Sequence, residues 1–300
     1  MAGRNANVIL AGVWPRLRLS EWALVAFFTY TFLASLAFPL PAVIKVAALG
    51  LALGVAVTVV VLDRCERRTQ PPLFSMVRDW LPIAFALVAY REMNWFATAH
   101  GKHILERSWI VWDRWLLQDC GISRLLESSG WLGPGFLEAC YLLVYAVGPF
   151  TVGILYGYHR RDLVDRVVLV YLVGTLLAYA LFPFFPSDPP RVVFQGLDLP
   201  RVMTPLRRLN LAIVGGYGIH SSVFPSAHVS SAFSAAWGLL LFFDKRRYGW
   251  MLLIYAMSVA VATVYGRYHY ASDAAAGIAV SFVALAVAGA VKRFGRATGC

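Results

Sequence analysis

Two histidines in the last third of the chain each stand at the start of a long apolar run. The first, His228, belongs to "FPSAHVSS" (224–231), and the second, His269, to "TVYGRYHYASDAAAG" (263–277). Asp273 follows His269 by four residues, so on a helix the two side chains share one face. A carboxylate bonded to one ring nitrogen fixes the tautomer of an imidazole and makes the other nitrogen a better base or nucleophile.

The segment around the first histidine has the features of a helix start. Pro225 suits the first turn of a helix, so Ser226, Ala227 and His228 are predicted to occupy that turn. The first N–H groups of a helix lack intrahelical partners and, together with the helix dipole, favour a bound anion. A phosphate at Ser226 would lie within reach of His228. The alternative is a histidine that merely forms interfacial hydrogen bonds.

Three arginines are candidates for binding phosphate oxygens. Arg191 follows the prolines of "FPFFPSDPPRVV" (182–193), where a guanidinium can bind phosphate bidentately. Arg267 stands two residues before His269. Arg91 lies inside an apolar run, where an ionisable residue is expensive and usually faces the bundle interior, unless it has a structural partner or reaches the membrane surface.

The elements that position these residues are predicted to be membrane helices. Hydrophobic residues make up 59% of the 300-residue chain and charged residues 14%, far below the quarter or so that is usual in soluble domains. We predict an all-α, polytopic membrane helical bundle forming one membrane domain over residues 1–300, with no internal repeat. Eight apolar runs are long enough to span a membrane: about 21–40, 41–62, 80–98, 135–157, 164–185, 224–243, 249–266 and 271–291.

The net charge of +11 is a topology signal before it is a binding signal. With the N-terminus in the cytoplasm, the inside segments hold 16 Lys and Arg residues and the outside segments nine. This asymmetry follows the positive-inside rule. It predicts cytoplasmic N- and C-termini, both histidines on the extracytoplasmic side, and no nucleic-acid partner.

Two outside segments are not predicted to span. Residues 103–130 mix tryptophans with charges, as expected of one or two helices lying in the membrane interface, the alternative being a soluble cap. Residues 186–222 are rich in Pro and Gly and are predicted to form a long functional loop. The four cysteines lack paired metal spacing and no carboxylate cluster suits Mg²⁺, so neither a disulfide nor a metal or other cofactor is expected.

At this point the chain resembles a known family. "FPSAH" followed by "HYASD" is similar to the type 2 phosphatidic acid phosphatase superfamily, whose signatures are PSGH and SRxxxxxHxxxD. The similarity covers roughly residues 180–280, the catalytic core segment. It implies that His269 attacks phosphorus, that His228 protonates the leaving group, and that Asp273 orients the nucleophile.

The departures from the signatures point to one branch of that superfamily. Thr263 stands where the phosphatases carry an arginine, and Phe184 stands where they carry a lysine. The pattern is more similar to inositol phosphorylceramide synthases and their bacterial relatives, which are inositolphosphotransferases. Arg191, and also Arg267 and Arg91, are the candidates to replace the missing cations.

Three functions stay open at this stage. The resemblance favours a lipid phosphotransferase that passes a phosphate or phospho-head group to an alcohol or polyol through a phosphohistidine. The second function is a phosphatase acting on phosphatidic acid-type or polyprenyl (pyro)phosphate lipids. The third is a non-catalytic transporter or assembly factor. The sequence identifies neither the lipid, nor the acceptor, nor the oligomeric state.

Overall fold

A computed structural model describes residues 15–69, 72–97, 104–219 and 224–297. Every regular element in these ranges is helical, which confirms the predicted fold class. Cys65, Cys120 and Cys140 form no disulfide, as expected, and Cys300 lies outside the described residues. The termini, the end of the predicted span 80–98 and the start of the predicted interfacial segment 103–130 also fall partly outside.

The helices follow one another with short connections. The first half of the chain contains α2 (Leu19–Ala37), α3 (Ala42–Thr69), α4 (Pro72–Glu92), η1 (Met93–Phe96), α5 (Ile104–Arg114), η2 (Trp115–Asp119), α6 (Ile122–Glu127), α7 (Leu132–Leu142) and η3 (Leu143–Ala146). The second half contains α8 (Val147–Gly157), η4 (Arg161–Leu163), α9 (Val164–Leu181), η5 (Phe182–Phe184), α10 (Pro190–Val193), α11 (Pro205–Tyr217), α12 (Ala227–Phe242), α13 (Arg246–Tyr265) and α14 (Ala271–Ala297).

Seven helical stretches of the described chain are long and apolar enough to cross a membrane, so the protein is a multi-pass membrane protein. They correspond to seven of the eight predicted spans. The remaining one, α12, has 16 residues, which at about 1.5 Å per residue gives a helix shorter than a hydrocarbon core of roughly 30 Å.

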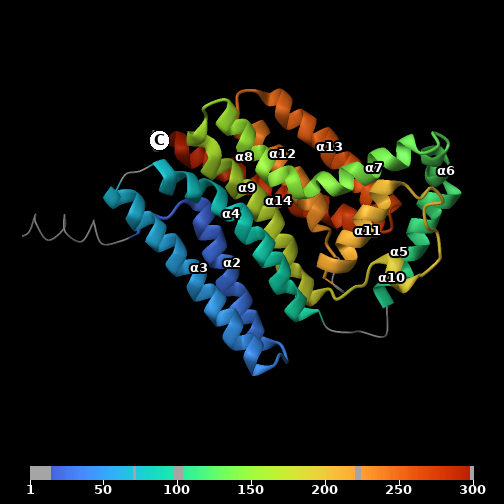
Figure 1. Cartoon of the computed structure of the whole chain (residues 1–300), viewed down its shortest axis with the longest axis horizontal. Helices are drawn as coiled ribbons and strands as arrows, with labels where there is room; N and C mark the ends of the chain where they lie inside the picture. Colours follow the sequence, from blue (N-terminus) through green and yellow to red (C-terminus); the bar gives the residue numbers. More distant parts are fainter. Residues whose placement is uncertain (1–14, 70–71, 98–103, 220–223, 298–300) are drawn as a thin grey trace, which may run out of the picture.

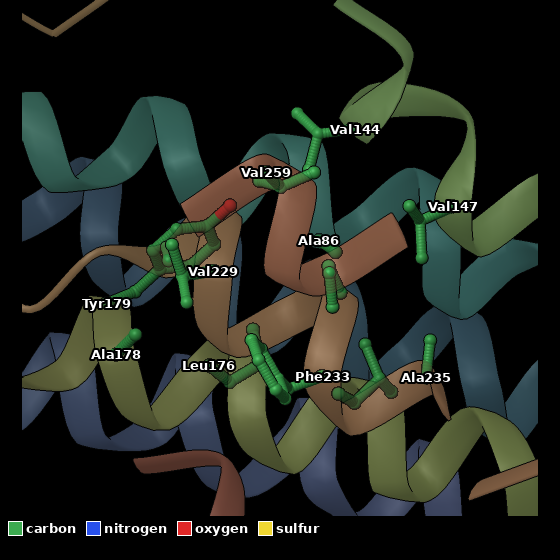
Figure 2. Close-up of a cluster of buried hydrophobic side chains, with 14 of the residues drawn as sticks. Ala86, Val144, Val147, Leu176, Ala178, Tyr179, Val229, Phe233, Ala235 and Val259 are labelled. Carbon is green, nitrogen blue, oxygen red and sulfur yellow. The ribbon is translucent and has the colours of Figure 1, made fainter. Parts of the chain in front are cut away.

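The short helix α12 lies at the centre of the bundle. It packs against α13, α9 and α14, while α2, α3 and α4 lie along the other side of α9 (Figure 1). Side chains from α9, α12 and α13 meet in the core, including Leu176, Phe233 and Val259 (Figure 2). A helix buried on all sides needs no full membrane length, because neighbouring helices and not lipid surround its ends.

A buried group of charges joins α2, α3 and α4 at the end of the bundle far from the two histidines. The Arg78 guanidinium binds Glu21 at 2.7 Å and Asp63 at 3.3 Å, and it also contacts Glu66. Arg78, Glu21 and Asp63 are all buried. These ion pairs attach the N-terminal helices to one another where apolar packing alone gives no unique register.

The long segment after α9 is not the simple loop that composition predicts. It contains a 13-residue helix, α11, between residues 205 and 217. The helix begins with Thr204 as N-cap, whose hydroxyl accepts from the Arg207 amide, followed by Pro205 in the first turn. A capping threonine followed by proline is a helix-start signal, so this prediction was wrong for a readable reason.

The segment 104–127 is helical, as predicted, with a π-helical turn between α5 and α6. Buried Glu106, Ile110 and Asp113 lie on one side of α5, while Val111 and Trp112 are exposed on the other. The helix is therefore amphipathic. That it lies in the membrane interface stays a prediction.

Candidate active site

The first turn of α12 carries the first histidine. Ser226 is the N-cap, and its hydroxyl accepts a hydrogen bond from the Val229 amide at 3.4 Å. Pro225 precedes this cap, so it lies one step earlier than predicted and outside the first turn. Ala227 and His228 are the first two helical residues, and their amides are free of intrahelical partners.

The second histidine lies in a turn and not on the last helix. The helix α14 begins at Ala271, two residues after His269. The amides of Tyr268 and His269 both donate to the carbonyl of Thr263, at 2.9 and 3.0 Å. Thr263, which stands in place of the family arginine, is buried and holds this turn through its backbone.

His269 and Asp273 meet, although not because they share a continuous helix. The Nδ1 atom of His269 lies 3.3 Å from Oδ2 of Asp273, and the same oxygen accepts from the Tyr270 amide at 2.9 Å. Both side chains are buried. The contact leaves Nε2 as the ring nitrogen of His269 that is not directed at the carboxylate.

The two histidines face each other across a cavity of about 130 Å³. Their ring centroids are 5.5 Å apart at an angle of 62°. The cavity also contains Arg191, Tyr268 and Ser231 in its wall, and it extends between the helices along tyrosine side chains. Two imidazoles and one guanidinium therefore converge on one enclosed space.

Of the three candidate arginines, Arg191 lies in this cavity wall. Its Nη1 donates to the Tyr268 carbonyl at 3.4 Å, and its guanidinium lies 5.7 Å from the centre of the Tyr268 ring. Its backbone amide donates to the carbonyl of Arg267. The residue is thus fixed to the turn that carries His269, with donor groups left over for a ligand.

Arg267 lies elsewhere. Its guanidinium is buried and pairs with Asp113 of α5 at 2.6 Å, and it is absent from the cavity wall. Asp113 also accepts from the amide of Ala271 at 2.8 Å. Burial raises the pKa of Asp113 to about 6, while Arg267 and the Ala271 amide act in the opposite direction. This pair therefore connects α5 to the start of α14.

Arg91 contacts the end of α11 and not the cavity. Its Nη1 donates to the Tyr217 carbonyl at 2.6 Å, and the guanidinium lies 5.1 Å from the centre of the Tyr217 ring. This is the structural partner that the sequence left open. Ser226 is likewise engaged, since its hydroxyl is the helix cap and its amide donates to the Asp273 carbonyl.

A family comparison matches the model of the PAP2 superfamily to residues 108–287, more than half of the chain. The chain belongs to the PAP2 superfamily. It is therefore an enzyme of the lipid phosphatase and phosphotransferase class. The PAP2 match extends well beyond residues 180–280 and includes α5 and α7. Neither the curated proteins nor the solved structures include a match to this chain.

Sequence reasoning missed a buried cluster beneath the turn of this PAP2 domain. Glu138 of α7 binds Arg207 at 2.8 Å and Asn210 at 2.7 Å, and it accepts from the Tyr268 hydroxyl at 2.7 Å. Burial and the Glu138 charge raise the pKa of Tyr268 far above its ordinary value, so its hydroxyl stays a donor. A carboxylate in the predicted span 135–157 was the signal, because charges in spans are expensive.

Proposed function

We propose that the protein transfers a phosphate or phospho-head group from a membrane lipid to an alcohol through a phosphohistidine at His269. The observation that carries this proposal is the placement of His228 and His269 on one cavity, 5.5 Å apart, with Arg191 in its wall. Asp273 lies behind the nucleophile. His269 and Asp273 are buried, which limits competing contact with bulk water.

In the first step, Nε2 of His269 attacks the phosphorus of the lipid in line with the leaving oxygen. The P–N bond forms as the P–O bond to the lipid alkoxide breaks. His228 gives its proton to that alkoxide. Asp273 stabilises the positive charge that develops on the His269 ring through Nδ1.

In the second step, the acceptor takes the place of the departed lipid alcohol. Its hydroxyl loses a proton to His228 as its oxygen forms a bond to phosphorus. The P–N bond then breaks and returns His269 to its starting state. One histidine thus serves as acid and then as base, as microscopic reversibility requires.

The positive field for the phosphoryl oxygens comes from Arg191 and from the amides of Ala227 and His228 at the start of α12. Such preorganised donors usually carry most of the catalysis of phosphoryl transfer. No step needs a metal ion. Ser226, Arg267 and Arg91 act in this proposal as supports of the site, since each has partners in the protein.

Tyrosine side chains in the cavity wall favour an alcohol over water as the acceptor. The hydroxyls of Tyr141, Tyr145 and Tyr179 form no hydrogen bond with other residues of the described chain, although they lie at the cavity. Buried polar groups normally have partners. A polyol would supply them, in keeping with the similarity to inositol phosphorylceramide synthases, whereas a single water molecule would satisfy few.

We also propose that residues 1–300 form one membrane domain with the site on the extracytoplasmic side, on the argument of the charge asymmetry. The catalytic core segment 180–280 then opens to the outer leaflet. The helices of residues 103–130 rest at that surface with Trp112 and Trp115 outward.

A transfer assay separates the phosphotransferase from the phosphatase. Purified protein in detergent micelles is given phosphatidic acid with a labelled phosphate, with and without excess myo-inositol. The proposal predicts that label appears on the polyol and that the lipid is consumed faster when the polyol is present. Release of inorganic phosphate alone, at a rate that no added alcohol changes, would make the protein a lipid phosphate phosphatase.

A further inference from the structure

The imidazole of His228 is held by tyrosine rings and by no hydrogen bond within the described chain. The ring of Tyr141, on α7, is stacked on it with centroids 5.1 Å apart and planes at 18°. Tyr145 meets it edge-on at 5.7 Å. Packing alone therefore sets the orientation of this ring, and both its nitrogens are left for proton transfer.

The same tyrosine also contacts the turn of the second histidine. The other stacking partner of Tyr141 is Tyr268, with centroids 3.8 Å apart and planes at 9°. Tyr268 directly precedes His269. Tyr141 thus lies between the two segments that carry the reacting histidines, and one ring is in contact with both.

A buried ion pair fixes the lower side of this stack. Glu138, one helical turn before Tyr141 on α7, accepts from the Tyr268 hydroxyl and binds Arg207 of α11. Arg207 also donates to the carbonyl of Gly266 at 3.2 Å, within the same turn. Removing either partner of a buried pair is costly, so Tyr268 has little freedom to move away from Tyr141.

We propose that Tyr141 is a positioning residue for His228. Its ring keeps the imidazole facing the phosphorus, and the negative π-face stabilises the ring while it carries its proton. The inference rests on the proposed function, because it needs His228 as the group that protonates the leaving alkoxide. It goes further by assigning this control to α7, which contains neither histidine.

The effect depends on the leaving group, which separates positioning from mere folding. A lipid alkoxide needs the proton from His228, whereas nitrophenolate leaves readily without one. Loss of the Tyr141 ring therefore lowers phosphoenzyme formation from phosphatidic acid and largely spares formation from 4-nitrophenyl phosphate. Loss of its hydroxyl alone leaves the stack in place.

The test compares Tyr141→Leu and Tyr141→Phe in rapid labelling of purified protein by both donors. We expect Tyr141→Leu to label roughly tenfold to a hundredfold more slowly from phosphatidic acid, a part of the 10²–10⁴ that general acids contribute. Labelling from the nitrophenyl ester changes less than about threefold, and Tyr141→Phe stays near wild type with both donors. Equal losses with both donors in Tyr141→Leu, or a Tyr141→Phe as damaged as Tyr141→Leu, would overturn the inference.

Two further variants keep the test decisive. Tyr145→Leu removes the edge contact from a partly exposed side chain and is expected to show the same donor selectivity more weakly. Tyr179→Leu, a wall tyrosine that packs on Phe27 and Phe182 and not on His228, is the matched control and should change both donors alike. Selectivity in Tyr179→Leu equal to that in Tyr141→Leu would contradict the inference.

A double mutant distinguishes this inference from the proposed function. A residue that acts only through His228 has no further effect on labelling from phosphatidic acid once His228→Ala is present. Additive losses would show that Tyr141 acts by another route while the phosphohistidine stands. Labelling that survives in His269→Ala would instead remove the proposed function itself.

Discussion

The backbone amide of Ser226 donates a 2.9 Å hydrogen bond to the carbonyl oxygen of Asp273. This bond joins the start of α12 to the first turn of α14. The side chain of Asp273 in turn contacts His269. The two histidine segments are therefore held together by backbone as well as by side chains, and their spacing is sensitive to any shift between these helices.

Gly277 permits that close approach, and Gly277→Ala should disturb it. A Cβ at this position would lie 2.5 Å from the carbonyl oxygen of Ser226, so α14 must move away from α12. Displacement of reacting groups by about 1 Å can cost 10²-fold, and we expect a loss of that order in turnover. Gly289→Ala on the same helix, where an added Cβ meets nothing within 4 Å, is the control. Similar turnover for the two variants would contradict this account.

Arg191→Lys should weaken the enzyme although it keeps the charge. A lysine cannot bind phosphate oxygens bidentately, and a lost charge-assisted hydrogen bond is worth about 1.5–3 kcal/mol. We expect kcat/KM for phosphatidic acid to fall roughly tenfold to a hundredfold. The exposed Arg208 of α11, which is not in the cavity wall, is the matched control as Arg208→Lys. Equal kinetics in both variants would remove Arg191 from the site.

Arg78→Met should destabilise the bundle without touching the active site. It leaves Glu21, Asp63 and Glu66 without their shared cation. Breaking a buried pair costs about 3–5 kcal/mol. The exposed pair of Arg160 and Asp162 provides the control, because Arg160→Met removes a surface ion pair worth about 0–1 kcal/mol. Thermal unfolding in detergent compares the two, and equal shifts in Tm would argue against the buried network.

Cysteine accessibility tests the proposed orientation. Cys120 is exposed near α6, so in a background lacking the other three cysteines it should react with an impermeant maleimide on intact cells. In the same background with Cys120 also replaced, Asp244→Cys, exposed between α12 and α13, should react only after permeabilisation. The reverse pattern would place the site in the cytoplasm.

The fold was largely predictable because membrane helices leave a strong signal in hydropathy. Each long span of the structure coincides with an apolar run, since only helices satisfy the backbone in lipid. α11 was missed because Pro and Gly dominate its surroundings and hide the capping signal at Thr204. α12 is short because it is enclosed by protein, which the sequence of one helix does not reveal.

The site was predictable where residues lie near one another in sequence, and less so elsewhere. The pair of His269 and Asp273 followed from a spacing of four, although a turn and not a helix brings them together. The partners of Arg267 and Arg91 come from distant helices, α5 and α11, and no local pattern indicates them. The stacking of Tyr141 between two aromatic rings is likewise a property of tertiary packing.

The central claim is the covalent intermediate on His269. Rapid quenching of the protein with labelled phosphatidic acid, followed by mapping of the labelled peptide, measures it directly. The account predicts acid-labile, base-stable label on His269 in wild type, slower labelling in Asp273→Asn, and none in a folded His269→Ala. Label on another residue, or near-normal labelling and turnover in His269→Ala, would contradict the account.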